Sequence, residues 1–139
     1  MSILKTNTLT GTTSAGSINV TGEGGSTTTN LQQGLAKGWC HMRGSGTPQL
    51  DDSLNLGSIT DTATGRFTLN ISNNFGNANY ACVSGISGND AVTTTGRSQL
   101  TDATPTTSAF AFRNVQANSD ATTLNDDTNI LFAFHGDLA

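Results

Sequence analysis

The spacing of apolar residues predicts β-strands along most of this chain. The clearest case is Phe67, Leu69 and Ile71, which alternate with polar residues at the period of a strand with one buried face. The polar stretch before them ends in Gly65 and is typical of a hairpin loop, because glycine takes a positive φ without strain. We therefore predict that residues 51–71 form an antiparallel hairpin at the core of an all-β domain.

The first strand of this hairpin interrupts its own alternation. Leu56 and Ile59 lie three residues apart, with Gly57 between them. A β-bulge at Gly57 and Ser58 would return Ile59 to the buried face.

The other strands of the domain show the same period of two. They are predicted at residues 36–43, 80–86, 97–100, 107–115 and 130–135. Seven or eight short strands in about 100 residues, joined by turns and two longer polar loops, are typical of a β-sandwich or jelly-roll-like domain. The last strand is apolar on both faces, so it is either central in a sheet or lies between the sheet and a neighbouring subunit.

The chain is predicted to have two parts. Residues 1–35 form an extended N-terminal arm with a short helical turn, and residues 36–139 form the β-sandwich knob. The arm has few apolar residues among many Thr, Ser, Gly and Asn, so it cannot build a core alone. It is either a disordered tail or an arm that orders against another protein by strand addition, and its β-branched residues favour extended structure.

The helical turn is predicted to begin after Asn30. Asn30 is a suitable N-cap, and Gln33 stands at the capping-box position. Leu31 and Leu35 are four residues apart and share one face. That face could meet its copies around a threefold axis, or the turn could cap one end of the β-domain.

The composition indicates that the fold needs a partner surface. Leu, Ile, Val and Phe make up about a fifth of the chain, a level typical of disorder, but disorder also needs a higher net charge than −4. A folded chain with so few large apolar residues buries little apolar area. The free energy gained from that burial is small compared with the cost of ordering the chain. Copies of the same chain are the simplest partner, because symmetric homo-oligomers are the usual solution.

The candidate interface residues are the apolar side chains of the arm, the two leucines of the helical turn and one residue of the last strand. They are Ile3, Leu4, Leu9, Ile18, Val20, Leu31, Leu35 and Phe132.

Charge and hydropathy argue against nucleic acid and membrane partners. Six Lys and Arg face ten Asp and Glu, and no basic stripe is present to neutralise phosphates. No apolar run is long enough for a transmembrane helix, and the N-terminus lacks the apolar core of a secretory signal. We expect synthesis in a host cytoplasm.

No motif for catalysis, a cofactor or a metal is found. His41 and His135 are the only histidines, and no nucleophile motif accompanies them. The pairs Asp51-Asp52 and Asp126-Asp127 lack the spacing of a calcium loop. The two cysteines, Cys40 and Cys82, are interpreted as reduced, buried thiols.

Several segments resemble the small β-domains of short fibre and surface proteins of tailed bacteriophages, especially marine and cyanobacterial phages. The matching pieces, which span roughly the last three quarters of the chain, are Trp39, the loop at residues 44–48, and residues 51–56, 58–61, 64–69, 77–81 and 134–137.

The resemblance implies a homotrimer on the virion surface that is not an enzyme. It implies a capsid decoration (cement) protein or a short fibre, which would bind a virion protein such as the major capsid or a tail protein through its arm. The alternative is the receptor-binding tip of a tail fibre, which recognises host surface polysaccharide through Trp39, Tyr80, Asn89 and Asp90.

Overall fold

The computed structural model describes residues 3–14, 17–22, 24–87, 96–117 and 123–139. The contacts within the chain divide it into two units, Met1–Leu35 and Ala36–Ala139. The second unit consists of β-strands, and the prediction of an all-β fold is confirmed. In the described residues, no helix is both long and apolar enough to cross a bilayer.

The first unit contains a small hairpin and one helical turn. Strand β1 (Asn19–Thr21) pairs antiparallel with β2 (Thr28–Asn30), and the helical turn α1 (Leu31–Gly34) follows directly. The side chain of Asn30 accepts hydrogen bonds from the backbone N–H groups of Gln32 and Gln33, so the predicted N-cap is confirmed. Strand β1, which includes Val20, therefore has a partner strand within its own chain.

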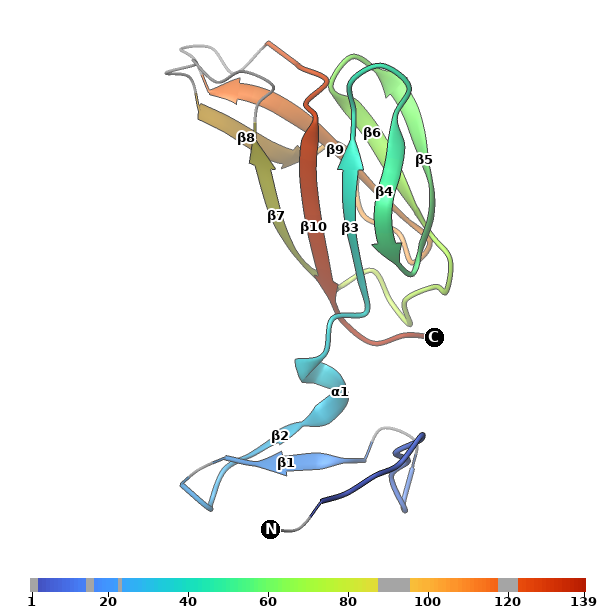
Figure 1. Ribbon diagram of the computed structural model, residues 1–139, viewed down its shortest axis with the longest axis vertical. Coiled ribbons are helices and arrows are strands. Elements are labelled where there is room, and N and C mark those ends of the chain that lie inside the picture. Colours follow the sequence, from blue (N-terminus) through green and yellow to red (C-terminus); the bar gives the residue numbers. More distant parts are fainter. Residues whose placement is uncertain (1–2, 15–16, 23, 88–95, 118–122) are drawn as a thin grey trace. The chain divides into compact units, whose positions relative to one another are not determined.

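The second unit packs two four-stranded antiparallel sheets face to face, in the arrangement of a β-sandwich (Figure 1). Its strands are β3 (Gly38–Arg43), β4 (Gln49–Leu54), β5 (Leu56–Ala63), β6 (Arg66–Ile71), β7 (Ala81–Ser87), β8 (Gly96–Thr101), β9 (Ala109–Ala117) and β10 (Asn129–His135). One sheet has the order β4-β3-β10-β7 and the other β5-β6-β9-β8.

The predicted hairpin is formed by β5 and β6. Its register shifts between Leu56 and Ser58, which confirms the bulge at Gly57. Gly65 closes the turn with a φ of 65°, and a Cβ there would lie 2.7 Å from the backbone nitrogen of Asn125. Only glycine fits at this position, because the backbone is left-handed and the space is filled.

One prediction about this region is wrong. Leu54 and Leu56 do not belong to one strand, because Asn55 adopts a φ of 59° and passes the chain from β4 in one sheet to β5 in the other. Asparagine tolerates the left-handed region better than most residues. Its side chain amide donates to the carbonyls of Lys37 and Asn73 at 3.0 Å each, which fixes this corner.

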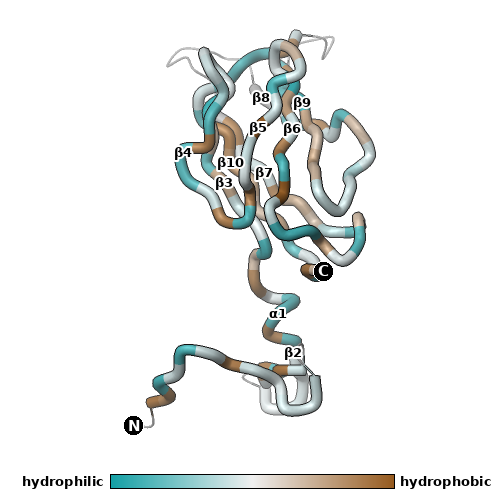
Figure 2. Tube along the Cα trace, turned by 90° about the vertical axis from the view of Figure 1, so that its right-hand side faces the viewer, coloured by the Kyte–Doolittle hydropathy of each residue, from teal (hydrophilic) through white to brown (hydrophobic). Residues whose placement is uncertain are grey.

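The core between the sheets is rich in aromatic side chains. Hydrophobic and hydrophilic residues both occur along the strands of each sheet (Figure 2). The buried cluster comprises Cys40, Met42, Leu56, Phe67, Leu69, Ile71, Phe75, Phe110, Phe112, Ile130, Phe132 and Phe134. All six phenylalanines of the chain are in this cluster.

Strand β10 lies in the middle of its sheet, between β3 and β7. This confirms the interpretation that its two apolar faces belong to a central strand. Phe132 faces inward with 5% of its surface exposed, and its ring centroid lies 4.6 Å from that of Phe112 and 5.7 Å from that of Phe110. As a core residue, Phe132 has no side-chain surface to offer to a neighbouring subunit. Its strand neighbours Leu131 and Ala133 point outward instead.

Phe75 is a core residue that the sequence pattern did not identify, because it lies in a turn-rich loop without alternation. Its ring stacks on that of Tyr80 at a centroid distance of 4.4 Å. The Tyr80 hydroxyl donates to the carbonyls of Thr106 and Ala109, so this side chain closes one end of the core.

We predict that Phe132→Ala destabilises the second unit by about 3–5 kcal/mol, because it removes a buried ring at the centre of the aromatic cluster. Urea denaturation followed by circular dichroism measures the change. Leu100→Ala, at an exposed position of β8, is the control and should alter the free energy of unfolding by no more than about 0.5 kcal/mol. Equal effects of the two substitutions would contradict the assignment of Phe132 to the core.

Candidate functional site

The outer face of the sheet β4-β3-β10-β7 carries an unbroken row of apolar residues across all four strands. Leu54 pairs with Trp39, Trp39 with Ala133, and Ala133 with Val83. In the next row, Leu131 lies between His41 and Gly85. We call the surface formed by Leu54, Trp39, Ala133, Val83, Leu131 and Gly85 the apolar face.

The side chains of the apolar face are substantially exposed. The exposed fraction is 63% for Val83, 48% for Leu131, 47% for Leu54 and 37% for Trp39. Single exposed apolar residues are common on proteins, but a contiguous apolar patch usually marks an interaction site. The chain has few large apolar residues, and four of them are exposed on this one face, which makes it the candidate interaction surface.

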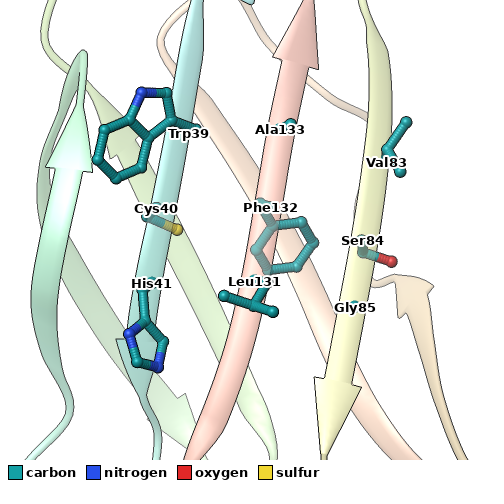
Figure 3. A pocket seen from close by; sticks show the side chains of 9 residues that line it. All are labelled: Trp39, Cys40, His41, Val83, Ser84, Gly85, Leu131, Phe132 and Ala133. Carbon is teal, nitrogen blue, oxygen red and sulfur yellow. The ribbon is translucent and has the colours of Figure 1, made fainter.

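The apolar face is hollowed along β10 and β7. A depression of about 490 Å³ is lined mainly by Trp39, His41, Val83, Gly85, Leu131 and Ala133. Figure 3 shows these residues on the three adjacent strands β3, β10 and β7. Gly85 contributes no side chain, and this omission opens the depression on the β7 side.

The outer face of the other sheet has a different character. The Asn70 side chain donates to the hydroxyl oxygens of Ser58 and Thr60, at 3.0 and 3.1 Å. Arg66 donates to both carboxylate oxygens of Asp102, at 2.6 and 2.7 Å. Polar side chains bonded to one another in this way are typical of a solvated sheet face, and the contrast distinguishes the apolar face.

Polar residues border the apolar face along the strands. Arg43 forms an ion pair with Asp51 at 2.8 Å, and Gln49 donates to the same carboxylate at 3.0 Å. Hydrogen bonds from Gln49 and Arg43 lower the pKa of Asp51. The His41 ring lies 3.3 Å from the Asn129 amide oxygen.

The two cysteines lie on the inward side of the same sheet and are free thiols, as expected. Cys40 pairs with Phe132 on one side of β10 and Cys82 with Phe134 on the other, so two strand spacings of about 4.8 Å separate them. That distance exceeds the reach of a disulfide. Burial raises the pKa of each thiol from 9.0 to about 12, which makes both unreactive at neutral pH.

Most of the predicted interface residues of the first unit are exposed. They are Ile3, Leu4, Leu9, Val20 and Leu35. Ile18 and Leu31 are half-buried and joined by a backbone hydrogen bond of 2.8 Å from the Leu31 N–H to the Ile18 carbonyl.

The predicted receptor-binding residues also separate. Trp39 is exposed on the apolar face, whereas the Tyr80 ring packs into the core. Asn89 and Asp90 lie outside the described residues. Sequence reasoning missed the apolar face because Leu54, Val83 and Leu131 meet only through the pairing of strands that are distant along the chain.

Within the described parts of the chain, no group of three or more His, Cys, Asp or Glu side chains could hold a metal ion. His41 pairs with Leu131, four residues from His135 along β10, which corresponds to about 13 Å along the strand. The two histidines therefore do not share a site.

Comparison with protein-family models, with curated proteins and with solved structures gave no match.

We predict that the second unit becomes less stable as the pH rises above about 9. Burial raises the pKa of Cys40, Cys82 and Tyr80 to about 12, from 9.0 for the thiols and 10.0 for the phenol. Well below pH 9 these groups are protonated in both states. Above it the unfolded chain releases protons that the folded chain retains until about pH 12, so the free energy of unfolding falls.

Urea denaturation at pH 8.0 and pH 10.5 tests this dependence. The expected loss is on the order of 1 kcal/mol, discounted for the partial exposure of Cys82. The Cys40→Ala/Cys82→Ala variant should lose less stability between the two pH values than the natural chain does. An equal loss in both proteins would show that the thiols do not contribute.

Proposed function

We propose that this chain is a non-enzymatic structural protein of a phage virion surface. In this proposal it is a homotrimer that acts as a capsid decoration (cement) protein or as a short fibre. Three apolar faces cover one another, and the first unit attaches the trimer to a capsid or tail protein. The resemblance of residues 51–69 and of the other matching segments to phage surface proteins supports the virion location.

The observation that carries this proposal is the apolar face. Burial of a fully exposed large apolar side chain stabilises a fold or an interface by roughly 1.5–3 kcal/mol. Covering four side chains that are already about half-buried therefore contributes roughly half of that for each. A chain with so small an apolar content has a strong reason to cover this surface, and a copy of itself is the usual cover.

The second candidate function is recognition of host polysaccharide, and the exposed indole of Trp39 favours it. Sugar sites combine a stacking ring with several polar groups that bond the hydroxyls. The depression beside Trp39 is lined mostly by apolar residues, and His41 and Ser84 are the only members of its lining with a polar side chain. The apolar face therefore suits a protein surface better than a glycan.

Sedimentation of the purified chain, together with imaging of particles that carry it, tests the proposed function. We expect a single trimeric species at micromolar concentration and density for it at regular positions on the particle. A monomer at every concentration would refute the assembly. A glycan array that shows specific binding, lost in Trp39→Ala, would instead support the receptor-binding function.

We predict that deletion of residues 1–30 leaves the second unit folded but abolishes its attachment to particles. The chain divides into two units, and every residue of the buried core cluster belongs to the second unit. Circular dichroism should show an unchanged β-spectrum, while co-sedimentation with particles should fall below detection. Full occupancy of particles by the shortened chain would contradict the role of the first unit.

A further inference from the structure

We infer that the cleft between the edge strands β7 and β8 binds a neutral sugar unit. The cleft lies on the inner side of β7, whereas the apolar face lies on the outer side of the same sheet. The inference therefore does not depend on the proposed assembly. It gives the second candidate function, recognition of a polysaccharide, a site other than the exposed indole of Trp39.

The two sheets are joined on one side and open on the other. On one side, Asn55 connects β4 to β5, and on the other side β7 and β8 are the edge strands of their sheets. Between β7 and β8 lies a cleft of about 300 Å³, at the lower end of the roughly 300–1,000 Å³ that is typical of ligand sites. A small molecule can enter it from solvent without any strand having to move.

The inward positions of the two edge strands carry small or polar side chains. Ser84 pairs with Phe132 and Thr101 with Phe112, so both hydroxyl groups lie on the inner side of the sheets, beside core rings. The inward positions of the central strands are instead mostly Phe, Leu and Ile. The packed core therefore stops short of the β7–β8 side, and the cleft extends inward to the buried rings.

The chemistry of the lining indicates what the cleft can hold. Among the described residues that line it, none is charged, so a charged ligand group would lose its water without gaining a partner of opposite sign. Pro105 and the rings at the floor offer apolar contact, while Ser84 and Thr101 offer hydroxyl groups from opposite walls. A neutral sugar unit combines apolar C–H faces with hydroxyl groups around its ring, and it matches a lining of this mixed kind.

Gln99 adds an amide with unused hydrogen-bonding capacity to the β8 wall. Its Nε2 donates to the Asn114 Oδ1 at 3.4 Å, which is long for a hydrogen bond, and its Oε1 is buried without a partner in the described part of the chain. Exchanging O and N in both amides would leave an N–H group unpaired instead. The last torsion of a glutamine side chain is soft, so the amide can turn toward a sugar hydroxyl, which both donates and accepts.

Tyr80, one of the predicted receptor-binding residues, also lines the cleft. Its ring stacks on Phe75, and its hydroxyl donates to the carbonyls of Thr106 and Ala109. A wall fixed in this way loses little conformational freedom when a ligand binds, which favours binding.

Titration of the full chain with the methyl glycosides of glucose, galactose, mannose and N-acetylglucosamine, followed by proton–nitrogen correlation NMR, tests the site. We expect at least one glycoside to shift the backbone signals of Ser84 and Thr101. The single indole N–H signal of the chain, from Trp39, should stay in place. It reports on the apolar face in the same spectrum.

Two substitutions in the cleft should weaken binding of that glycoside. Thr101→Val removes one hydroxyl group while keeping the shape of the side chain, and it should raise the Kd about two- to tenfold. Ser84→Leu fills the cleft from the β7 wall and should abolish the shifts. Thr68→Val makes the same change as Thr101→Val on the outer side of β6, and Trp39→Ala alters the apolar face, so both controls should bind like the natural chain.

Cyclohexanol, which has a ring but a single hydroxyl group, should bind at least tenfold more weakly than the best glycoside. The sugar site is refuted if none of the glycosides binds, if cyclohexanol binds as tightly as they do, or if binding is lost in Trp39→Ala and kept in Thr101→Val. Sedimentation tests the assembly separately. A trimer that binds no glycoside refutes only the sugar site, and a monomer that binds one refutes only the assembly.

Discussion

The packing of aromatic rings between the two sheets is the interaction on which the rest of the structure depends. All six phenylalanines lie in this layer, and Tyr80 packs against it at one end. Phe110 has ring contacts with Phe112, Phe132 and Phe134, with centroids between 5.3 and 6.4 Å apart. A chain rich in Thr, Ser, Asn and Gly thereby obtains a core from a few large, rigid side chains, each of which buries much area for its number of rotatable bonds.

The residues that form this core also determine which residues of the same strands face outward. The inward positions of β3 and β10 are occupied by Cys40, Met42, Ile130, Phe132 and Phe134, and strand alternation then directs their neighbours outward. On the other sheet, outward residues such as Asn70 and Arg66 bond to polar neighbours. On this sheet the outward residues include Trp39, Leu131 and Ala133, so the same alternation that builds the core also presents the apolar face.

Local patterns predicted the parts of the fold that depend on local spacing. The β5–β6 hairpin, the bulge at Gly57 and the Asn30 cap could all be read from neighbouring residues. The crossing of the chain from one sheet to the other at Asn55 could not be predicted in this way. An apolar run such as Leu54–Leu56 does not reveal that its two ends belong to different sheets. Phe75 was missed because it is held by ring stacking in a loop, and the apolar face was missed because it depends on which distant strands pair.

The corner at Asn55 has a consequence for how the molecule folds. A single residue separates a strand of one sheet from a strand of the other, so neither sheet can reach its final position while the other is still mobile. The side chain of Asn55 also bonds the segments that enter β3 and leave β6, through Lys37 and Asn73. The two layers are thus joined at their shortest connection, which favours their formation in one concerted step rather than as separate halves that dock later.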